Sequence, residues 1–151
     1  MAEESSIKKS LQEKFGSLSD DKFKIQRKRR ITVETGREDF EDVLKFSINE
    51  LEFVILCAIT GLDEIERFSV IYHIAKIDGV ILNIKVAVPK TDAVIRTVTP
   101  YFSAADIYER EIADLLGIRI DGLPSGNRYP LPDDWPADEY PLRKDWKKNG
   151  T

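Results

Sequence analysis

Few side chains in this sequence belong to the types that catalyse reactions or bind metals. His73 is the only histidine and Cys57 the only cysteine. One cysteine excludes an internal disulfide and a cluster held by cysteines alone, and one histidine leaves no histidine pair for a zinc or iron site. Cys57 falls in an apolar run that should bury it as an inert thiol, and no Ser, Cys or Asp lies at a recognisable triad spacing. We expect His73 to be a core or sheet-surface residue, and we predict no catalytic, metal-binding or cofactor-binding residue.

Two adjacent carboxylates, Asp133 and Asp134, could share a proton or bind a metal ion. Neighbours in an extended chain point apart, however, and no further acidic residues converge on them in sequence. A turn cap or an intermolecular ion pair is therefore the favoured interpretation. The glycines are scattered, so no Gly-rich phosphate-binding loop is predicted.

A basic stretch from Lys22 to Arg30 alternates charged with apolar residues and could contact phosphates. The whole chain has a formal net charge of −4 and a pI near 5.2, which argues against a general nucleic-acid binder. A strand edge, a solvated face or a contact with an acidic protein is favoured for this stretch. A basic nucleic-acid-binding module is kept as the remote alternative.

Three helices are predicted to position these residues. Apolar residues at a spacing of four predict the first, through Ile7, Leu11 and Phe15, with a stop at Gly16. Two S/T-x-x-D/E patterns, Thr35 with Glu38 and Ser103 with Asp106, predict capping boxes for the second and third helices. The expected buried stripes are Phe40, Val43, Leu44 and Ile48 in the second, and Ala105, Tyr108, Ile112, Leu115 and Leu116 in the third, which Gly117 should close.

Strands are expected between these helices. Ile31 to Val33 alternates as a strand does, and the apolar run Phe53 to Ile59 predicts a strand buried on both faces. Segments 68–77 and 80–88 flank Asp78-Gly79, a two-residue hairpin signal. That turn would place Ile77, Ala75, His73 and Ile71 opposite Val80, Leu82, Ile84 and Val86. Residues 89–100 are interpreted as a connection.

The fold class predicted is α+β, ordered α-β-α-β-β-β-α, with helices on one face of a mostly antiparallel sheet. Residues 1–120 form this single-domain body. Residues 121–151 contain five prolines with tyrosines and tryptophans between them, a density that forbids helix and sheet interior, so they are predicted to form an extended interaction arm. The longest apolar run is far shorter than the roughly 20 residues of a spanning helix, and no signal peptide is visible. We expect a soluble cytoplasmic chain.

Two motifs carry a resemblance to a known family. The run Tyr108 to Ile118, YEREIADLLGI, and the run Tyr140 to Trp146, YPLRKDW, occur in that order about two dozen residues apart. Together they resemble the C subunit of the respiratory complex I family, also called the thirty-kilodalton subunit of NADH dehydrogenase. The usual G-H-P-D-L-R-R stretch is here Gly122 to Arg128, without the histidine and one arginine. The following L-P-D-D-W-P, Leu131 to Pro136, is similar to the version in energy-converting nickel–iron hydrogenases and their sulfur-reducing relatives.

The resemblance implies a non-catalytic, cofactor-free accessory subunit in the peripheral electron-transfer arm of a membrane-bound, ion-translocating redox complex. It would pack on a large subunit like that of nickel–iron hydrogenases, near the iron–sulfur small subunit. The chain would then be peripheral, on the cytoplasmic side of the membrane, with no nucleic acid bound. The corresponding subunit of a respiratory NADH/quinone complex I is the alternative.

Partner contacts are predicted from the two motifs and the arm. Trp135 and Trp146 are of the type most enriched at energetic hot spots. Arg110 is expected to brace the base of the arm through Asp133, Asp134 or a carboxylate of the large subunit, with Glu109 beside it along the rim of its helix. The full set of predicted partner-binding residues is Glu109, Arg110, Asp114, Arg128, Asp133, Asp134, Trp135, Arg143, Lys144 and Trp146.

Overall fold

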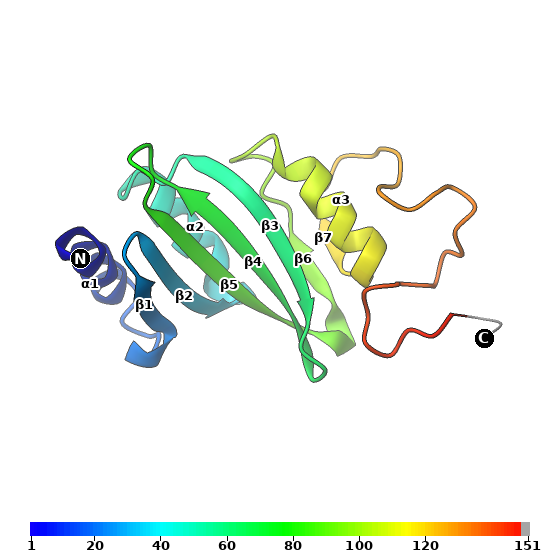
Figure 1. Cartoon of the computed structure of the whole chain (residues 1–151), viewed down its shortest axis with the longest axis horizontal. Coiled ribbons are helices and arrows are strands. Elements are labelled where there is room, and N and C mark those ends of the chain that lie inside the picture. The colour runs from blue at the N-terminus through cyan, green and yellow to red at the C-terminus, as the bar shows by residue number, and fades with distance from the viewer. Residues whose placement is uncertain (149–151) are drawn as a thin grey trace. The chain divides into compact units, whose positions relative to one another are not determined.

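The computed structural model describes residues 1–148, which divide into two compact units. Unit 1 comprises Met1–Ala58 and Val70–Ala87, and unit 2 comprises Ile59–Ser69 and the described residues from Val88 onward. The elements in chain order (Figure 1) are α1 (Ala2–Lys14), η1 (Asp20–Lys22), β1 (Phe23–Arg27), β2 (Arg30–Gly36), α2 (Arg37–Asn49), β3 (Ile55–Asp63), β4 (Arg67–Ala75), β5 (Ile81–Pro89), η2 (Lys90–Asp92), β6 (Val94–Arg96), α3 (Ala105–Leu116) and β7 (Arg119–Asp121).

Five strands form one sheet in the order β1-β2-β5-β4-β3, and β6 pairs with β7 in a second, two-stranded sheet. β1 and β2 are antiparallel, whereas β2 and β5 are parallel. The α+β class with a mostly antiparallel sheet, predicted from the sequence, is confirmed. The basic stretch contains β1, which lies at an edge of the sheet, one of the interpretations favoured for it.

The alternation of apolar residues positions the strands of unit 1. In β5 every second residue is buried from Leu82 to Val86, the period expected where one face of a sheet meets a core. The register places Leu82 beside Ile31 and Ile84 beside Val33, so four fully buried side chains align across two strands. A shift of one residue would turn them all toward the other face.

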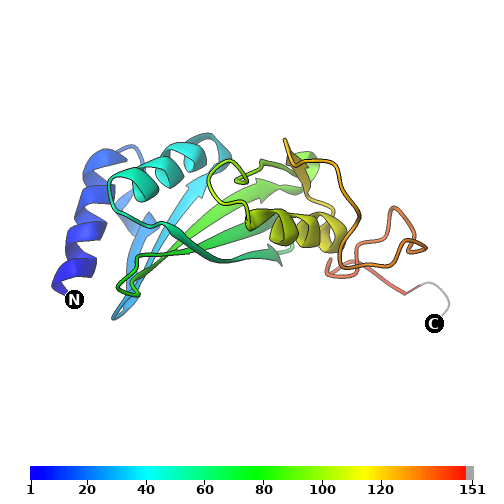
Figure 2. The same ribbon diagram turned by 90° about the horizontal axis from the view of Figure 1, so that it is seen from above.

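The second predicted helix is α2 (Figure 2), and three of the four residues of its expected stripe, Phe40, Val43 and Leu44, are buried. Phe40 is buried and its ring stacks on Tyr72 of β4, with centroids 4.5 Å apart. Ser47 takes the fully buried place expected for Ile48, and its hydroxyl donates to a carbonyl one turn earlier. The predicted capping box is wrong: Thr35 belongs to β2 and the N-cap is Gly36, with no side-chain cap.

Three expectations about the strands of unit 1 are also wrong. The run Phe53 to Ile59 leads into β3, an edge strand rather than a central one, and Cys57 is exposed. The β4–β5 turn is wider than two residues, because Gly79 N donates to Lys76 O at 3.0 Å. Gly79 has φ +91, so the loop resembles a type I turn followed by a left-handed residue. Ile77 lies in this turn and is 86% exposed. The predicted face of β4 is wrong as well: His73 lies against Asn83, and the buried apolar residues alternate through Phe68, Val70, Tyr72 and Ile74.

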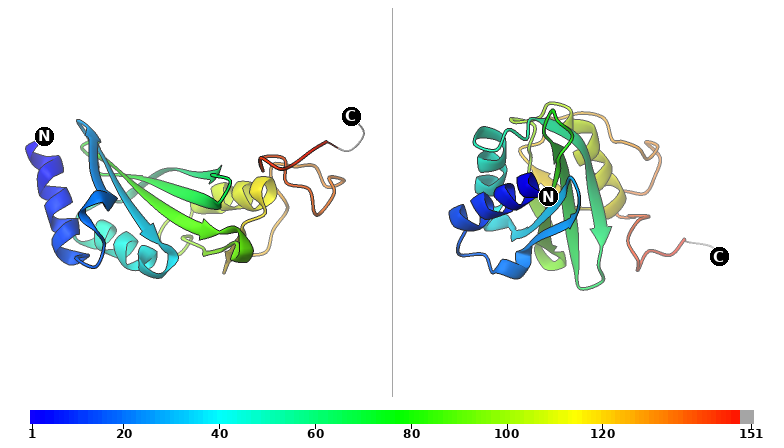
Figure 3. Two further views of the ribbon diagram at one scale, coloured as in Figure 1. Left: turned by 90° about the horizontal axis from the view of Figure 1, so that it is seen from below. Right: turned by 60° about the vertical axis from the view of Figure 1, so that its left-hand side comes forward.

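Unit 2 contains α3, the β6–β7 pair and the segment after β7 (Figure 3). Gly117 closes α3 at φ +72, as predicted, but the N-cap is Ala104 and the Ser103–Asp106 capping box is not formed. The expected connection 89–100 holds η2 and β6. Residues 122–148, here named the C-terminal segment, contain turns and no helix or strand. Within residues 1–148, no helix has the length and apolar character needed to cross a membrane.

Candidate partner-binding interface at α3 and the C-terminal segment

Glu109 is the most deeply buried charged residue of α3, with no exposed surface. Its carboxylate accepts hydrogen bonds from the Thr97 hydroxyl at 2.6 Å and the Val98 amide at 2.7 Å. Burial raises the pKa of Glu109, and the two donors oppose that rise. This carboxylate therefore ties α3 to the chain that follows β6. The expectation that Glu109 lies along the rim of the helix is wrong.

Arg110 links α3 to the start of the C-terminal segment. Its guanidinium donates two hydrogen bonds to the Asp106 carboxylate one turn earlier, from Nε to Oδ1 at 2.5 Å and from Nη2 to Oδ2 at 3.2 Å. Nη2 also donates to the Pro124 carbonyl at 2.5 Å. Arg110 thus contacts the base of the segment, as expected, but through a backbone carbonyl. The predicted pairing with Asp133 or Asp134 is wrong within this chain.

Asp114 holds the middle of the segment. One carboxylate oxygen accepts from Arg128 Nε at 2.8 Å and the other from the Leu131 amide at 2.8 Å. Arg128 Nη1 then donates to the Trp135 carbonyl at 2.8 Å. Asp114 is 8% exposed, so this ion pair is shielded from water more than a surface pair is. The pattern E-x-x-x-x-D in α3 therefore places one carboxylate toward β6 and another toward the C-terminal segment.

The two tryptophans of the segment lie together. Their ring centroids are 6.0 Å apart at 33°. Both indole N–H groups donate hydrogen bonds to Glu139. Trp135 donates to the Glu139 backbone carbonyl at 2.8 Å, and Trp146 donates to the Glu139 carboxylate at 3.3 Å. Both rings stay partly exposed. The pair is a preformed aromatic surface held by its own hydrogen bonds.

Arg143 closes the C-terminal end of α3. Its Nε donates to the Leu116 carbonyl at 2.6 Å, one of the carbonyls that a helix end leaves without a partner. The guanidinium also lies over two rings, 5.2 Å from the centroid of Phe68 and 4.5 Å from that of Tyr140, within the range of cation–π attraction. A methyl group at Gly117 would sit 2.7 Å from Tyr140, so glycine is required there by space as well as by φ.

Asp63, at the end of β3, is a site that the sequence did not reveal. Its side chain is 1% exposed and pairs with Lys90 at 2.6 Å. It also accepts from the amides of Ile65 and Lys144, each at 2.9 Å. Burial raises the pKa of the Asp63 carboxyl, but the Lys90 ammonium and the two amides outweigh it and lower the pKa to about 2. Asp63 therefore fixes the end of the C-terminal segment to the β3–β4 turn.

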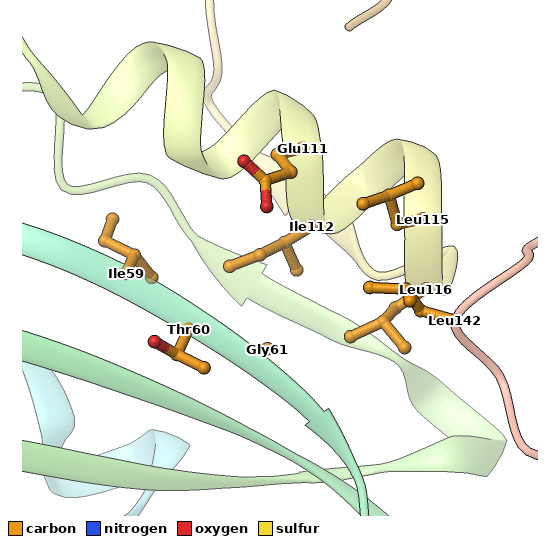
Figure 4. Close-up of a pocket in the computed structure, with 8 residues that line it drawn as sticks. All are labelled: Ile59, Thr60, Gly61, Glu111, Ile112, Leu115, Leu116 and Leu142. Atoms are coloured by element: carbon orange, nitrogen blue, oxygen red, sulfur yellow. The ribbon is translucent and has the colours of Figure 1, made fainter. Parts of the chain in front are cut away.

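An apolar groove of about 190 Å³ runs between α3 and β3. Figure 4 shows Ile112 and Leu116 directed from the helix toward Gly61, with Leu142 of the C-terminal segment beside Leu116. A methyl group at Gly61 would lie 2.6 Å from Leu116, so glycine permits this close approach. Leu142 is 55% exposed although its amide donates to the Leu115 carbonyl. The groove offers apolar surface with Glu111 at its margin.

The predicted partner-binding residues fall into three groups. Arg110, Asp114, Arg128 and Arg143 hold the chain's own C-terminal segment, and the buried Glu109 holds the chain after β6. Trp135 and Trp146 are partly exposed and paired, and the side chains of Asp133, Asp134 and Lys144 are exposed. Asp133 and Asp134 lie in the turn Pro132–Trp135, closed by a 3.0 Å backbone bond, which agrees with their turn interpretation.

The remaining candidates lie apart from this network. His73 lies on β4, where Nδ1 is 2.8 Å from Asn83 Oδ1, a sheet position as expected. In the part of the chain that the structure describes, no three His, Cys, Asp or Glu side chains gather closely enough to hold a metal ion.

Comparisons with known proteins identify the family. Residues 33–151 match the model of the respiratory-chain NADH dehydrogenase 30 Kd subunit. The C subunit of the NADH-quinone oxidoreductase of Geobacter sulfurreducens is 31% identical, over 99% of this chain and 93% of the relative. The C subunit of the F(420)H(2) dehydrogenase of Methanosarcina mazei is 33% identical, over 78% of this chain and 76% of the relative.

Two further matches differ in how much of the matched protein this chain covers. The C/D subunit of the NADH-quinone oxidoreductase of Shewanella oneidensis is 34% identical over 92% of this chain, which spans only 25% of that relative. A chain in the structure of the membrane-bound sulfane sulfur reductase, an archaeal respiratory membrane complex, matches with a TM-score of 0.82 and 26% identity, over 95% of this chain and 85% of the other. These matches confirm the resemblance carried by the YEREIADLLGI and YPLRKDW motifs: the chain belongs to the family of the respiratory-chain NADH dehydrogenase 30 Kd subunit.

Proposed function

We propose that this chain is a non-catalytic, cofactor-free accessory subunit of a membrane-bound, ion-translocating redox complex. It packs on a large hydrogenase-like subunit, near an iron–sulfur small subunit, in the peripheral arm on the cytoplasmic side of the membrane. Electron transfer and ion translocation take place in the other subunits. This chain positions the large subunit relative to them.

The observation that carries the proposal is the way the C-terminal segment is held. A segment without helix or strand lacks the regular backbone hydrogen bonds that would hold it in one conformation. Fixing its backbone costs about 1–2 kcal/mol of conformational entropy per residue. Here Arg110, Asp114, Arg143 and Asp63 tie it to α3 and the β3–β4 turn at four points along its length. A segment ordered before binding avoids that entropic cost at the interface.

The exposed side chains of the held segment are of the interface type. Tyr129 and Leu142 are exposed, the tryptophan pair is partly exposed, and the same segment carries exposed charged side chains such as Asp133 and Lys144. Aromatic anchors within a polar rim are the usual anatomy of a protein–protein interface. Preformed aromatic anchors of this kind favour a stable assembly over a transient encounter.

The relatives support both the complex and the large partner. The Shewanella oneidensis protein is a single C/D chain, of which this chain spans only 25%, and such a fusion is expected where this type of subunit works beside a larger one. The archaeal sulfane sulfur reductase complex contains a chain whose match covers 95% of this one. The L-P-D-D-W-P sequence, Leu131 to Pro136, also favours a complex of the hydrogenase and sulfur-reducing type. A respiratory complex that reduces quinone is the second candidate, favoured by relatives named NADH-quinone oxidoreductase.

Purification of the tagged chain from native membranes in mild detergent tests the proposal. We expect the large hydrogenase-like subunit and the iron–sulfur small subunit in equal amounts with the chain, and no iron, nickel, zinc or flavin in the chain isolated alone. A chain that elutes alone would contradict the proposal. Salt-sensitive binding of oligonucleotides through β1 would support the nucleic-acid alternative instead.

A further inference from the structure

Ile65, in the turn between β3 and β4, has a backbone conformation that its side chain disfavours. Its φ is +72, and the Glu66 amide donates across it to the Glu64 carbonyl at 2.9 Å. A hydrogen bond between residues two apart with positive φ at the centre marks the rare and strained form of the γ-turn. Left-handed φ in a β-branched residue is a true outlier, and such outliers cluster at functional sites.

The turn is held firmly on both sides of Ile65. The buried Asp63 carboxylate accepts from the Ile65 amide. Glu64 accepts from Arg67 Nε at 3.1 Å and from the Ser69 hydroxyl at 2.6 Å, and its amide donates to the Arg67 carbonyl. These bonds fix the strained conformation, which glycine or asparagine would adopt at less cost.

Burial of the isoleucine side chain within its own chain does not offset this strain. The residue is 64% exposed, and its neighbours Glu66 and Arg67 are exposed as well. The result is an exposed apolar side chain on a hydrogen-bonded turn, followed directly by two exposed charged residues.

We propose that Ile65 is a hydrophobic anchor that inserts into an apolar pocket of a partner subunit, a pocket edged by a basic residue that faces Glu66. An apolar knob within a polar ring is the arrangement of an interface hot spot, where the surrounding contacts exclude water. The inference rests on the proposed function, because it requires a complex. Asp63 supports it, since the same carboxylate binds both the Ile65 amide and the Lys144 amide. The anchor is therefore continuous with the C-terminal segment proposed to bind the partner.

Ile65→Asn separates an anchor from a merely structural residue, because the two roles predict opposite changes. Asparagine tolerates left-handed φ, so relief of strain should raise the Tm of the isolated full-length chain by about 2–4 °C. Loss of the anchor should lower incorporation into the complex about tenfold. Incorporation is measured by expressing tagged wild-type and variant chains together in native cells and comparing the two tags in the purified complex.

Two matched variants serve as controls. Arg29→Asn changes a charged residue with a similar φ of +61, and should leave incorporation unchanged whatever its effect on Tm. Ile77→Asn removes an isoleucine that is even more exposed, in the β4–β5 turn, and should leave both Tm and incorporation unchanged.

A higher Tm together with lower incorporation for Ile65→Asn alone would support the anchor. Incorporation of Ile65→Asn at the wild-type level would overturn it, as would a fall in Tm, which would show that Ile65 stabilises its own chain. An equal loss with Ile77→Asn would also overturn it, because surface hydrophobicity in general would then be responsible. If the wild-type chain itself is absent from any complex, the proposed function fails and the anchor fails with it.

Discussion

The substitution Asp63→Asn tests whether one buried carboxylate fixes the C-terminal segment. Asparagine keeps the shape of the side chain and removes its charge. The ion pair with Lys90 is then lost. The Ile65 and Lys144 amides bind different carboxylate oxygens, so only one of them keeps an acceptor, and the other faces the NH2 group of asparagine. We expect a less stable chain in which the end of the segment opens more often.

The size of the effect follows from the pKa of Asp63. The pKa falls from 3.8 to about 2 on folding, and each unit is worth about 1.36 kcal/mol, so the negative charge contributes at most about 2.4 kcal/mol. Lys90 stays 29% exposed and keeps part of its hydration, so we expect a loss of about 2 kcal/mol at pH 7. For a chain of this length that lowers Tm by about 4–8 °C.

The loss should also depend on pH. Because the folded pKa is depressed, the carboxylate stabilises the chain fully above pH 3.8 and loses this effect as the pH falls toward about 2. The difference in unfolding free energy between wild type and Asp63→Asn should therefore shrink by about 1 kcal/mol between pH 7 and pH 3. Urea denaturation at pH 7, 5 and 3 measures it, with exposed Asp138→Asn as the control for removing a carboxylate from unit 2.

Limited trypsin digestion reports on the segment itself. Cleavage after Lys144 should be faster in Asp63→Asn than in wild type, because the amide that Asp63 holds is that of Lys144. Equal unfolding free energies at pH 7, or a difference that stays constant down to pH 3, would refute the reasoning about Asp63.

Three further predictions concern α3 and the tryptophan pair. Glu109→Gln should keep the fold, and Glu109→Ala should lose about 2–3 kcal/mol of unfolding free energy, since alanine leaves a buried amide unpaired. Because burial raises the pKa of Glu109, the stability of the wild type should fall as the pH rises above 4.5. Thermal melts should show no such fall from this group in Glu109→Gln. Arg110→Lys should cost about 1 kcal/mol and weaken assembly, because an ammonium cannot bind Asp106 and the Pro124 carbonyl in the same fork; normal assembly of both Arg110→Lys and Arg110→Ala would contradict this. Trp135→Ala should leave Tm within about 4 °C of wild type and lower incorporation into the complex about tenfold, measured by two-tag competition.

The parts of the fold that the sequence predicted are those with long periodic patterns. α2 and α3 have apolar stripes over three turns, and β5 alternates from Ile81 to Val88. The strands β6 and β7 are three residues long, too short for periodicity to distinguish them from a connection. The apolar run Phe53 to Ile59 predicts a strand buried on both faces, whereas β3 has an exposed face and lies at the sheet edge. Its edge position depends on the strand order, which local sequence does not encode.

The candidate site was predicted in part, for similar reasons. Glu109, Arg110 and Asp114 are identified through the motif, but Glu109 is expected on the rim of the helix and lies in the core instead. Glu109 lies in the buried stripe because Thr97 and Val98 supply donors for it, and those donors come from a segment that was interpreted as a plain connection. Asp63 had no signal at all, since its partners lie 27 and 81 residues away in sequence. The strained φ of Ile65 is visible only in three dimensions.

Chemical cross-linking of the intact membrane complex, followed by mass spectrometry, tests most directly that this chain is a subunit bound through its C-terminal segment. Lysines are available at both ends of the described chain: Lys144, Lys147 and Lys148 in the segment, and Lys8 and Lys9 in α1. We predict cross-links from the C-terminal lysines to the large hydrogenase-like subunit, and far fewer from Lys8 and Lys9. Cross-links from α1 alone, or none to a large subunit, would contradict the account.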